Sequence, residues 1–275
     1  DWRGSADIEA AGAPLLRLLD LPPLPGAEED DRPLVALAAE PWRPMSLHVG
    51  MTADSLTARA VVDTPATVGV LLSPVTPGPI DGWDEGSVLD VRVEGEAPAS
   101  ASEAAVLGGV NQIAVECAGG GWELMQFADA TPVAPGVWEI ARRLRGQAGT
   151  DAMMPAVWPA GSVVVLIDGS VRQVDLPADI RGQLRHWRIG PASKSPDDPS
   201  YRHRAHVVSC DGLRPLSPCH LRVTGREVSW IRRTRIGGDG WDGVDVPLGE
   251  AAELYAFASF NQRDSISAAN YRQAN

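Results

Sequence analysis

Residues 87–93 read Ser-Val-Leu-Asp-Val-Arg-Val, and this short stretch decides the fold class. The apolar side chains of Leu89, Val91 and Val93 alternate with more polar positions, so they point to one face of an extended chain. A period of two is typical of a half-buried β-strand and does not fit an amphipathic helix. The stretch therefore predicts a sheet with one face against a core.

Other short apolar stretches lie on both sides of it, at intervals of about ten residues. Glycine (28) and proline (23) punctuate a chain of 275 residues, which favours many short elements over long helices. Between these strands, one helical turn is predicted at residues 102–108. Strands are predicted at 34–37, 46–49, 58–62, 67–72, 87–93, 112–116, 122–128, 137–142, 162–167, 170–175, 184–189 and 203–208. The sequence therefore predicts a mostly β protein built as a barrel or sandwich.

The strongest helical leaning lies at residues 8–20, where four leucines form an apolar stripe. Gly12 and Pro14 limit this helix to a turn or two. Prolines and an acidic run over residues 21–31 then favour an extended, solvated connector. We therefore predict that residues 1–32 form a helical turn followed by a connector.

Residues 212–275 read as a unit separate from an all-β module of residues 33–211. Their order of Ser-Pro-x-x-Leu, Val-Ser-Trp and Tyr resembles the opening strands of a fibronectin type III domain. In that domain the Trp packs into the sandwich core, and a full sandwich needs about 100 residues. Residues 212–275 are therefore expected to be an incomplete fibronectin type III-like unit. Its strands are predicted at 216–223, 227–232 and 254–257.

Charge and cysteine content exclude several classes of protein. The formal net charge of −12 disfavours nucleic-acid binding, because an acidic surface repels phosphates. No apolar run approaches the ~18–20 residues that cross a bilayer. The start at Asp1 resembles neither a signal peptide nor an initiator methionine, which predicts a fragment or processed piece. The three cysteines, Cys117, Cys210 and Cys219, argue against a disulfide framework. Cys210 and Cys219 could pair, but reduced, buried thiols in a protein folded in the cytosol are the preferred interpretation.

One zinc candidate consists of His203, His206 and Cys210. In a strand, positions 203 and 206 point to opposite faces, and zinc sites usually have tighter pairs and a fourth ligand. Histidines on a sheet surface are therefore the preferred interpretation.

A calcium candidate lies in the glycine-rich loop of residues 237–245, where Asp239, Asp242 and Asp245 offer hard oxygen ligands. Their spacing does not fit an EF-hand loop, so a plain hairpin loop is the preferred interpretation and calcium stays an alternative.

Motifs for catalysis are absent from the sequence. The turn of residues 145–150 lacks the lysine of a phosphate-binding loop, and no G-x-S-x-G elbow occurs. Asp81 and Asp84 are interpreted as part of a turn with an anchoring Trp83, because the sequence cannot place two carboxylates at a working separation. The sequence therefore predicts no enzyme, no cofactor, and no catalytic, cofactor-binding or metal-binding residue.

A group of arginines allows two interpretations. It would contact an acidic partner surface, or it would form internal salt bridges to the chain's excess carboxylates. Its members are Arg214, Arg222, Arg226, Arg232, Arg233 and Arg235.

Two blocks carry a resemblance to a known family. Residues 121–130 (GWELMQFADA) and 141–151 (ARRLRGQAGTD) resemble the E-x-x-Q-F…L-L-R-G-x-x-G-T pattern of siphophage tail-tip hub proteins. Residues 212–218, 230–235 and 246–255 are similar to the large baseplate protein of gene transfer agents and their phage relatives.

This resemblance spans residues 14–260 and implies a place at the distal tip of a phage-like tail. Such proteins form homotrimers that close the tail tube, contact other tail-tip, distal tail and baseplate proteins, and carry host-facing domains. They belong to a virion or gene transfer agent particle assembled in the bacterial cytoplasm. Full-length relatives also contain a TIM-barrel domain similar to glycoside hydrolases, for which this chain has no βα alternation. The chain departs from the family pattern at Met125, over residues 140–143 and after Phe260.

Within the hub module, Arg145 and the turn of residues 146–151 are expected to form a rigid loop at a subunit contact, with Gly146 and Gly149 supplying positive φ. The expected core anchors are Trp122, Phe127, Trp138 and Leu144. Two other functions stay open. One is a receptor- or carbohydrate-binding module that attaches to host envelope glycans through exposed tryptophans and the 237–245 loop. The other is part of a cell-wall hydrolase whose catalytic domain lies outside this chain.

Overall fold

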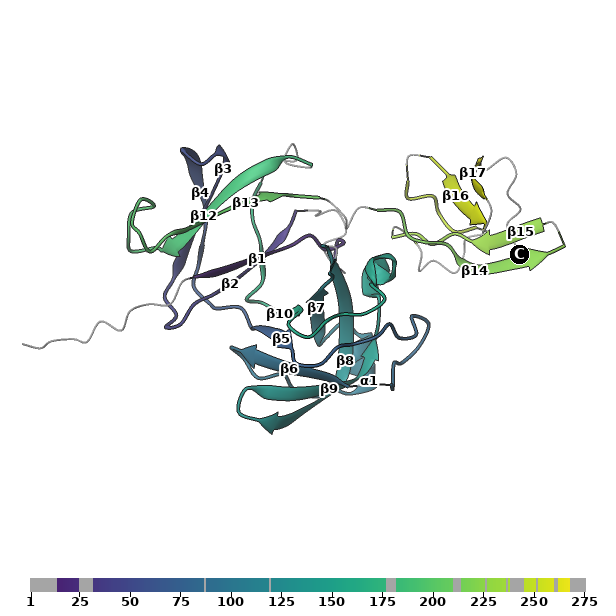
Figure 1. Ribbon diagram of the computed structural model, residues 1–275, viewed down its shortest axis with the longest axis horizontal. Coiled ribbons are helices and arrows are strands. Elements are labelled where there is room, and N and C mark those ends of the chain that lie inside the picture. Colours follow the sequence, from purple (N-terminus) through teal and green to yellow (C-terminus); the bar gives the residue numbers. More distant parts are fainter. Residues whose placement is uncertain are drawn as a thin grey trace, which may run out of the picture.

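The structure is a computed structural model, and most of its elements are strands, as the sequence predicts. Among the described residues the helical elements are α1 (Glu103–Leu107), inside the predicted turn, and the 3₁₀ segment η1 (Gln147–Met153). Figure 1 shows a barrel, a sandwich and a separate C-terminal unit. The described residues are 14–24, 32–86, 88–118, 120–176, 182–209, 214–225, 227–235, 237, 245–250, 252–259 and 262–267.

Six antiparallel strands close into a barrel in the order β10-β5-β6-β9-β8-β7. They are β5 (Val68–Leu71), β6 (Leu89–Glu94), β7 (Gln112–Glu116), β8 (Trp122–Ala134), β9 (Val137–Leu144) and β10 (Val163–Ile167). Leu89, Val91 and Val93 of β6 are buried in the barrel core, as their alternation predicts.

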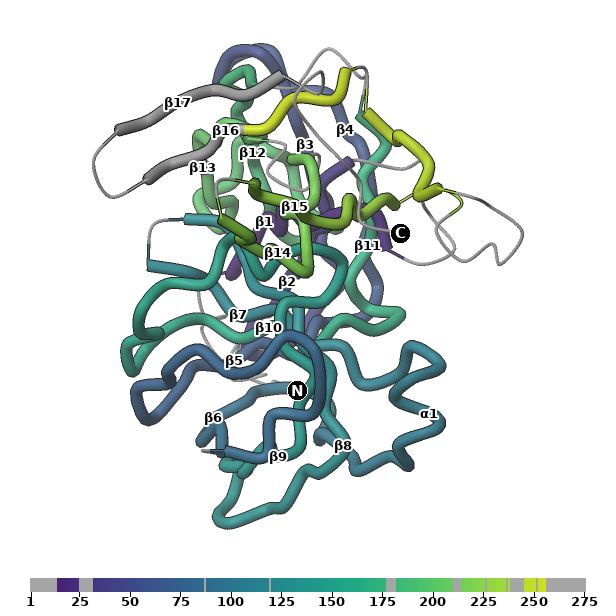
Figure 2. The backbone as a smooth tube through the Cα atoms, turned by 90° about the vertical axis from the view of Figure 1, so that its right-hand side faces the viewer, coloured from purple at the N-terminus to yellow at the C-terminus, as the bar shows by residue number. Residues whose placement is uncertain are grey.

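Two further sheets pack face to face above the barrel (Figures 1 and 2). One has the order β13-β12-β3-β4, and the other has the order β1-β2-β11. Their strands are β1 (Leu15–Leu19), β2 (Leu34–Ala38), β3 (Met45–Thr52), β4 (Ser55–Val62), β11 (Arg172–Gln173), β12 (Leu184–Pro191) and β13 (Arg202–Val207). Leu37, Leu47 and Trp187 lie at the centre of their shared apolar core. These two sheets are called the sandwich below.

The sheet of β1, β2 and β11 is covered on both faces. Val35 and Leu37 of β2 point into the sandwich core, whereas Leu34 and Ala36 pack against the outside of the barrel. A strand buried on both faces reads as a continuous apolar run, which explains the sequence Leu-Val-Ala-Leu-Ala. The molecule therefore has three layers, with this sheet in the middle.

The helix expected at residues 8–20 is wrong for its described part. Residues 15–19 form strand β1, which pairs with β2 from Leu15↔Ala38 to Leu19↔Leu34. Leucine favours helices locally, but pairing with β2 lets both faces of the segment be buried, and tertiary context overrides propensity. Residues 8–13 and most of the predicted connector lie outside the described residues.

The barrel is inserted into the sandwich along the chain. Strands β1 to β4 precede it, and β11 to β13 follow it and return to the same two sheets. The sandwich therefore holds both ends of the barrel segment. The predicted strands of this module are all present, although β11 is shorter and β8 longer than expected.

The C-terminal unit contains two hairpins. One joins β14 (Cys219–Thr224) to β15 (Glu227–Ile231), and the other joins β16 (Leu254–Ser259) to β17 (Gln262–Ser267). The three predicted strands are present, and β17 is additional. Trp230 is buried, with its ring edge-on to Tyr255 at 4.8 Å between centroids, as expected of a core Trp. In the described part of the chain, no helix is long and apolar enough to cross a membrane.

Candidate functional site: interlocked motif blocks in the barrel

A buried ion pair joins the two blocks that carry the family resemblance. Glu123 of β8 is fully buried, and Arg145 directly follows β9. Arg145 Nε and an Nη atom donate to the two carboxylate oxygens of Glu123 at 2.8 and 3.0 Å. The backbone N–H of Gly146 donates to the same carboxylate at 3.1 Å. This bidentate geometry fixes the end of β9 against β8.

Asp84 extends the pair into a network. Arg143 and Arg145 donate to Asp84 Oδ2 at 2.6 and 3.0 Å. The backbones of Asp84 and Arg143 also exchange two hydrogen bonds, of 2.7 and 3.1 Å. A Cβ on Gly78 would lie 2.5 Å from Asp84 Oδ2, so only glycine lets that loop pass over the network. The loop before β6 is thereby tied to β9.

The remaining motif residues add hydrogen bonds at the same end of the barrel. Thr150 Oγ1 accepts from the backbone N–H of Leu124 at 2.9 Å. The side-chain amide of Gln126 donates to the carbonyl oxygens of Val106 and Val110, at 2.6 and 3.0 Å, and so holds α1 against β8. The two blocks are therefore joined by the bonds of Glu123 with Arg145 and of Leu124 with Thr150, whereas Gln126 binds residues outside them.

The network also contacts aromatic and sulfur groups. The Arg145 guanidinium lies 4.9 Å from the ring centroid of Trp158, which is fully buried. Burial, followed by the nearby charge of Glu123, raises the pKa of the Cys117 thiol to about 11. Burial therefore disfavours the thiolate form of Cys117 at neutral pH.

Proton transfer is not what this arrangement favours. Burial raises the pKa of Glu123, against the hydrogen bonds from Arg145 and Gly146. Burial also acts to raise the pKa of Asp84, but hydrogen bonds from Arg143, Gly86 and Arg145 outweigh it and leave that pKa below its usual value. The four charged side chains are at most 7% exposed and are paired with one another. In this structure the four side chains are therefore shielded from solvent and neutralise one another.

The turn after Arg145 depends on two glycines. Gly146 and Gly149 have φ values of 58° and 85°, as the sequence predicts. A Cβ on Gly146 would lie 2.7 Å from the Cβ of Asp151, so the turn closes tightly on itself. The backbone conformation thus favours glycine at both positions.

The C-terminal unit docks on this turn. An Nη atom of Arg233 donates to both carboxylate oxygens of Asp151 at 3.0 Å. A Cβ on Gly149 would lie 2.0 Å from Leu216 Cδ2, so Leu216 occupies the space that glycine leaves. The turn thus contacts the C-terminal unit of the same chain. The contact with another subunit that the sequence suggests for this turn stays a prediction.

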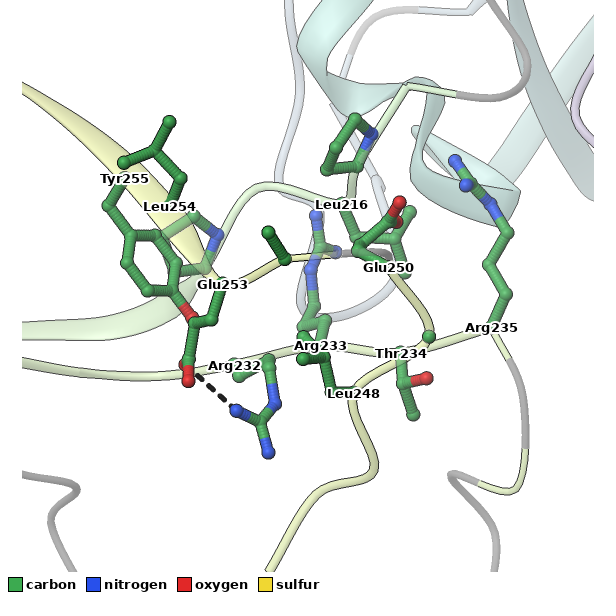
Figure 3. A pocket seen from close by; sticks show the side chains of 14 residues that line it. Leu216, Arg232, Arg233, Thr234, Arg235, Leu248, Glu250, Glu253, Leu254 and Tyr255 are labelled. Atoms are coloured by element: carbon green, nitrogen blue, oxygen red, sulfur yellow. Dashed lines mark hydrogen bonds and ion pairs between the residues drawn. The ribbon is translucent and has the colours of Figure 1, made fainter. Parts of the chain in front are cut away.

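The arginine group is largely paired inside the chain. Arg232 donates to Glu253 at 2.8 Å (Figure 3), and Arg233 binds Asp151. Arg235 donates to the carbonyl oxygen of Arg214. The cavity that these residues border holds only about 50 Å³. The internal salt-bridge interpretation is therefore confirmed for Arg232 and Arg233, and Arg226 lies outside the described residues.

The metal candidates do not come together among the residues that can be assessed. His203 is exposed, His206 is half-buried on the opposite face of β13, and Cys210 lies outside the described residues. Asp239 and Asp242 also lie outside them, whereas Asp245 is 3.5 Å from Arg232. No group of three potential metal ligands occurs in the described ranges.

Two details of the sequence interpretation change, one at Asp84 and one at Leu144. Asp84 is not simply part of a turn but a buried member of the network, while Asp81 is exposed. Trp122 and Phe127 are buried and Trp138 is partly buried, as expected.

Leu144, expected as a core anchor, is only half-buried, and its neighbours Arg143 and Arg145 take the buried positions. Buried arginines are rare unless paired, so the pattern of β9 misleads. The available signal was Glu123, a carboxylate between the apolar residues Trp122 and Leu124.

A comparison with known families matches residues 66–165 to the family described as Rcc01698-like, C-terminal. The matched stretch begins before β5 and ends within β10, so it coincides with the barrel and includes both motif blocks. The barrel is the part of the chain that is similar to a known family. No curated protein matches the chain.

Proposed function

We propose that this chain is a structural component of a phage-like tail tip or baseplate hub, with the barrel as its hub module. The observation that carries the proposal is the interlocking of the two resemblance blocks through Glu123 and Arg145. Residues that resemble a hub signature make one rigid buried network here. This network supports a structural role, in which the barrel keeps a fixed shape.

The energetics favour a structural role for the network. Buried ion pairs add little net stability over apolar packing, but removing one partner is costly. Such a network therefore penalises alternative arrangements of the loops that it ties together. A ring of subunits that closes a tube needs loops held in this way.

In this proposal the chain assembles as a homotrimer with other tail-tip, distal tail and baseplate proteins. The sandwich holds both chain ends of the barrel segment, and the C-terminal unit lies to one side of them (Figure 1). The C-terminal unit contacts the turn at Gly149 through Leu216. Any hydrolase activity would belong to sequence outside this chain.

Cryo-electron microscopy of particles from the producing cell tests this proposal. An antibody fragment raised against the exposed β8–β9 hairpin tip would mark the chain without touching the network. Three copies at the distal end of the tail are expected. Absence of the chain from particles, or copies along the whole tube, would overturn the proposal.

A receptor- or carbohydrate-binding module is the second candidate function. Four tryptophans, Trp122, Trp158, Trp187 and Trp230, are buried and do not offer the expected contact. Trp42, Trp83 and Trp138 are partly exposed, so a contact through tryptophan stays a prediction. A polar hollow on the outer face of the sandwich also favours this function.

A further inference from the structure

The outer face of the sheet β13-β12-β3-β4 carries a group of polar side chains. Arg188 of β12 lies directly across from His48 of β3 and from His203 of β13. His203 also stacks on His186, with ring centroids 5.1 Å apart. This face points away from the sandwich core, so the charge and ring nitrogens gathered on it are not explained by packing.

A hollow of about 270 Å³ opens on this face. The turn between β3 and β4 forms one wall, the loop between β12 and β13 forms the other, and the floor is made by His48 and Arg188. The lining residues are His48, Ala53, Asp54, Leu56, Arg188, Pro196 and Asp197. Its size is near the lower end of the roughly 300–1,000 Å³ of small-molecule sites, so it has room for one small ring.

The floor of the hollow is held in place by its surroundings. His48 Nε2 is 2.9 Å from Ser46 Oγ, and the His48 ring meets the edge of Tyr201 at 5.9 Å between centroids. Tyr201 donates from its hydroxyl to the Pro191 carbonyl at 3.1 Å. A Cβ on Gly190 would lie 2.3 Å from the Tyr201 ring, so glycine is needed beneath it. A preformed floor lowers the entropic cost of binding.

Asp197 on the rim is free to turn toward a ligand, because its side chain is 92% exposed. Its contact with Arg188 of the floor is a long 3.3 Å, and Arg188 also donates to the carbonyl oxygen of Pro196 at 3.4 Å. An ion pair with one exposed partner contributes little stability, so Asp197 can exchange Arg188 for a ligand hydroxyl. Asp54 adds a second exposed carboxylate on the opposite wall.

We infer that this hollow binds one pyranose ring of a neutral saccharide. A sugar hydroxyl both donates and accepts, which fits two carboxylates beside a guanidinium and an imidazole. Leu56 and Pro196 offer apolar contact for the C–H face of the ring. The two rim carboxylates would repel an oxyanion, and the polar lining does not suit an apolar ligand. The site lies on the sandwich, and the inference does not depend on the hub proposal.

Saturation-transfer NMR on the whole chain tests this inference. The probes are glucose, galactose, N-acetylglucosamine and rhamnose, with glucuronic acid and inorganic phosphate as anionic arms. At least one neutral sugar is expected to bind with a dissociation constant in the millimolar range, and phosphate is not. A glycan array with the same protein then distinguishes a free sugar from a terminal residue of a surface glycan.

The decisive variant is Asp54→Asn combined with Asp197→Asn, because both side chains are exposed and the fold should be unaffected. A loss of sugar affinity of at least tenfold is expected. Asp175→Asn is the matched control, since Asp175 is an equally exposed partner of an arginine, Arg32, away from the hollow. Binding of phosphate alone, of no neutral sugar, or of a sugar equally well by the double variant would overturn the inference.

Discussion

The barrel and the sandwich are both closed β structures with similar apolar side chains, yet they differ in what lies at their centres. The barrel encloses Glu123, Arg143 and Arg145, all at most 1% exposed, beside its apolar core. The sandwich core gathers around Leu47 and Trp187, and the one buried arginine on that face of β12 is Arg185. Only the barrel corresponds to the matched family.

The two regions should therefore differ in the substitutions that they tolerate. An apolar core tolerates swaps that conserve volume, whereas a buried charge without its partner is strongly destabilising. The barrel therefore tolerates few substitutions at its buried charged positions and holds its loops in a fixed geometry. The apolar positions of the sandwich core tolerate more substitutions, provided that volume is conserved. This difference agrees with the proposed function, in which the barrel makes the contacts within an assembly and the sandwich supports it.

The largest expected effect comes from Glu123→Ala. It leaves Arg145 buried with only part of its charge compensated, so the free energy of unfolding should fall by about 3–5 kcal/mol. Urea unfolding followed by circular dichroism measures this loss. Glu94→Ala, at an exposed position of β6 in the same barrel, should change stability by less than about 0.5 kcal/mol.

A double variant sharpens the test. Replacing Glu123 and Arg145 together by Leu and Met should cost less than Glu123→Ala alone, because no unpaired charge remains at that pair. A double variant less stable than the single one would contradict this interpretation of the network.

The sandwich should respond in another way. Leu47→Ala removes a fully buried side chain and should cost about 2–5 kcal/mol, whereas Leu47→Met should cost less than about 1.5 kcal/mol. Chemical denaturation of both variants checks this. A Met variant as damaging as the Ala variant would show that the sandwich is as narrowly specified as the barrel.

Most of the strands could be predicted from the sequence, because the alternation of apolar and polar residues along a strand involves only neighbouring positions. The prediction made from the alternation around Leu89 is confirmed at each position, because Leu89, Val91 and Val93 are all buried. Strand β1 was missed because its leucines favour a helix until β2 and the barrel are beside it. Closure of the barrel by β10 against β5 and β7 is also long-range and leaves no local mark.

The candidate site was only partly predictable. The glycines at 146 and 149 signal a tight turn, and the structure gives both positive φ values. The burial of Arg143 and Arg145 was not predictable from their type, since arginine is usually exposed. The contact of Gly149 with Leu216 joins two distant segments, so no spacing rule reveals it.

A smaller effect is expected at the turn that joins the barrel to the C-terminal unit. Gly149→Ala places a methyl group against Leu216 and strains a positive φ, which should cost about 1–3 kcal/mol. Limited proteolysis should then release the C-terminal unit faster. Adding Leu216→Ala should restore part of the protection, because it removes the clash but not the strain. No difference between the single and double variants would contradict the docking described for Leu216.

The smallest effect concerns acid sensitivity of the sandwich. Burial, followed by Arg188, lowers the pKa of His48, and burial, followed by Arg204, lowers the pKa of His206. The unfolded chain then binds protons that the folded chain does not, so this part of the stability is present above about pH 6.5 and is lost as the pH falls toward the folded pKa values. Urea midpoints at pH 7 and pH 5 measure the loss. The variant His48→Asn/His206→Asn should reduce it, and His220→Asn, in β14, should not.

Hydrogen exchange with mass spectrometry on the whole chain tests the contrast between the two regions most directly. In Glu123→Ala, amides of residues 66–165 should lose protection while those of β3 and β12 retain most of theirs. In Leu47→Ala the order should reverse, with β3 and β12 losing protection first. Equal loss across both regions in both variants would contradict the account, because it would mean that barrel and sandwich form one undivided structural unit.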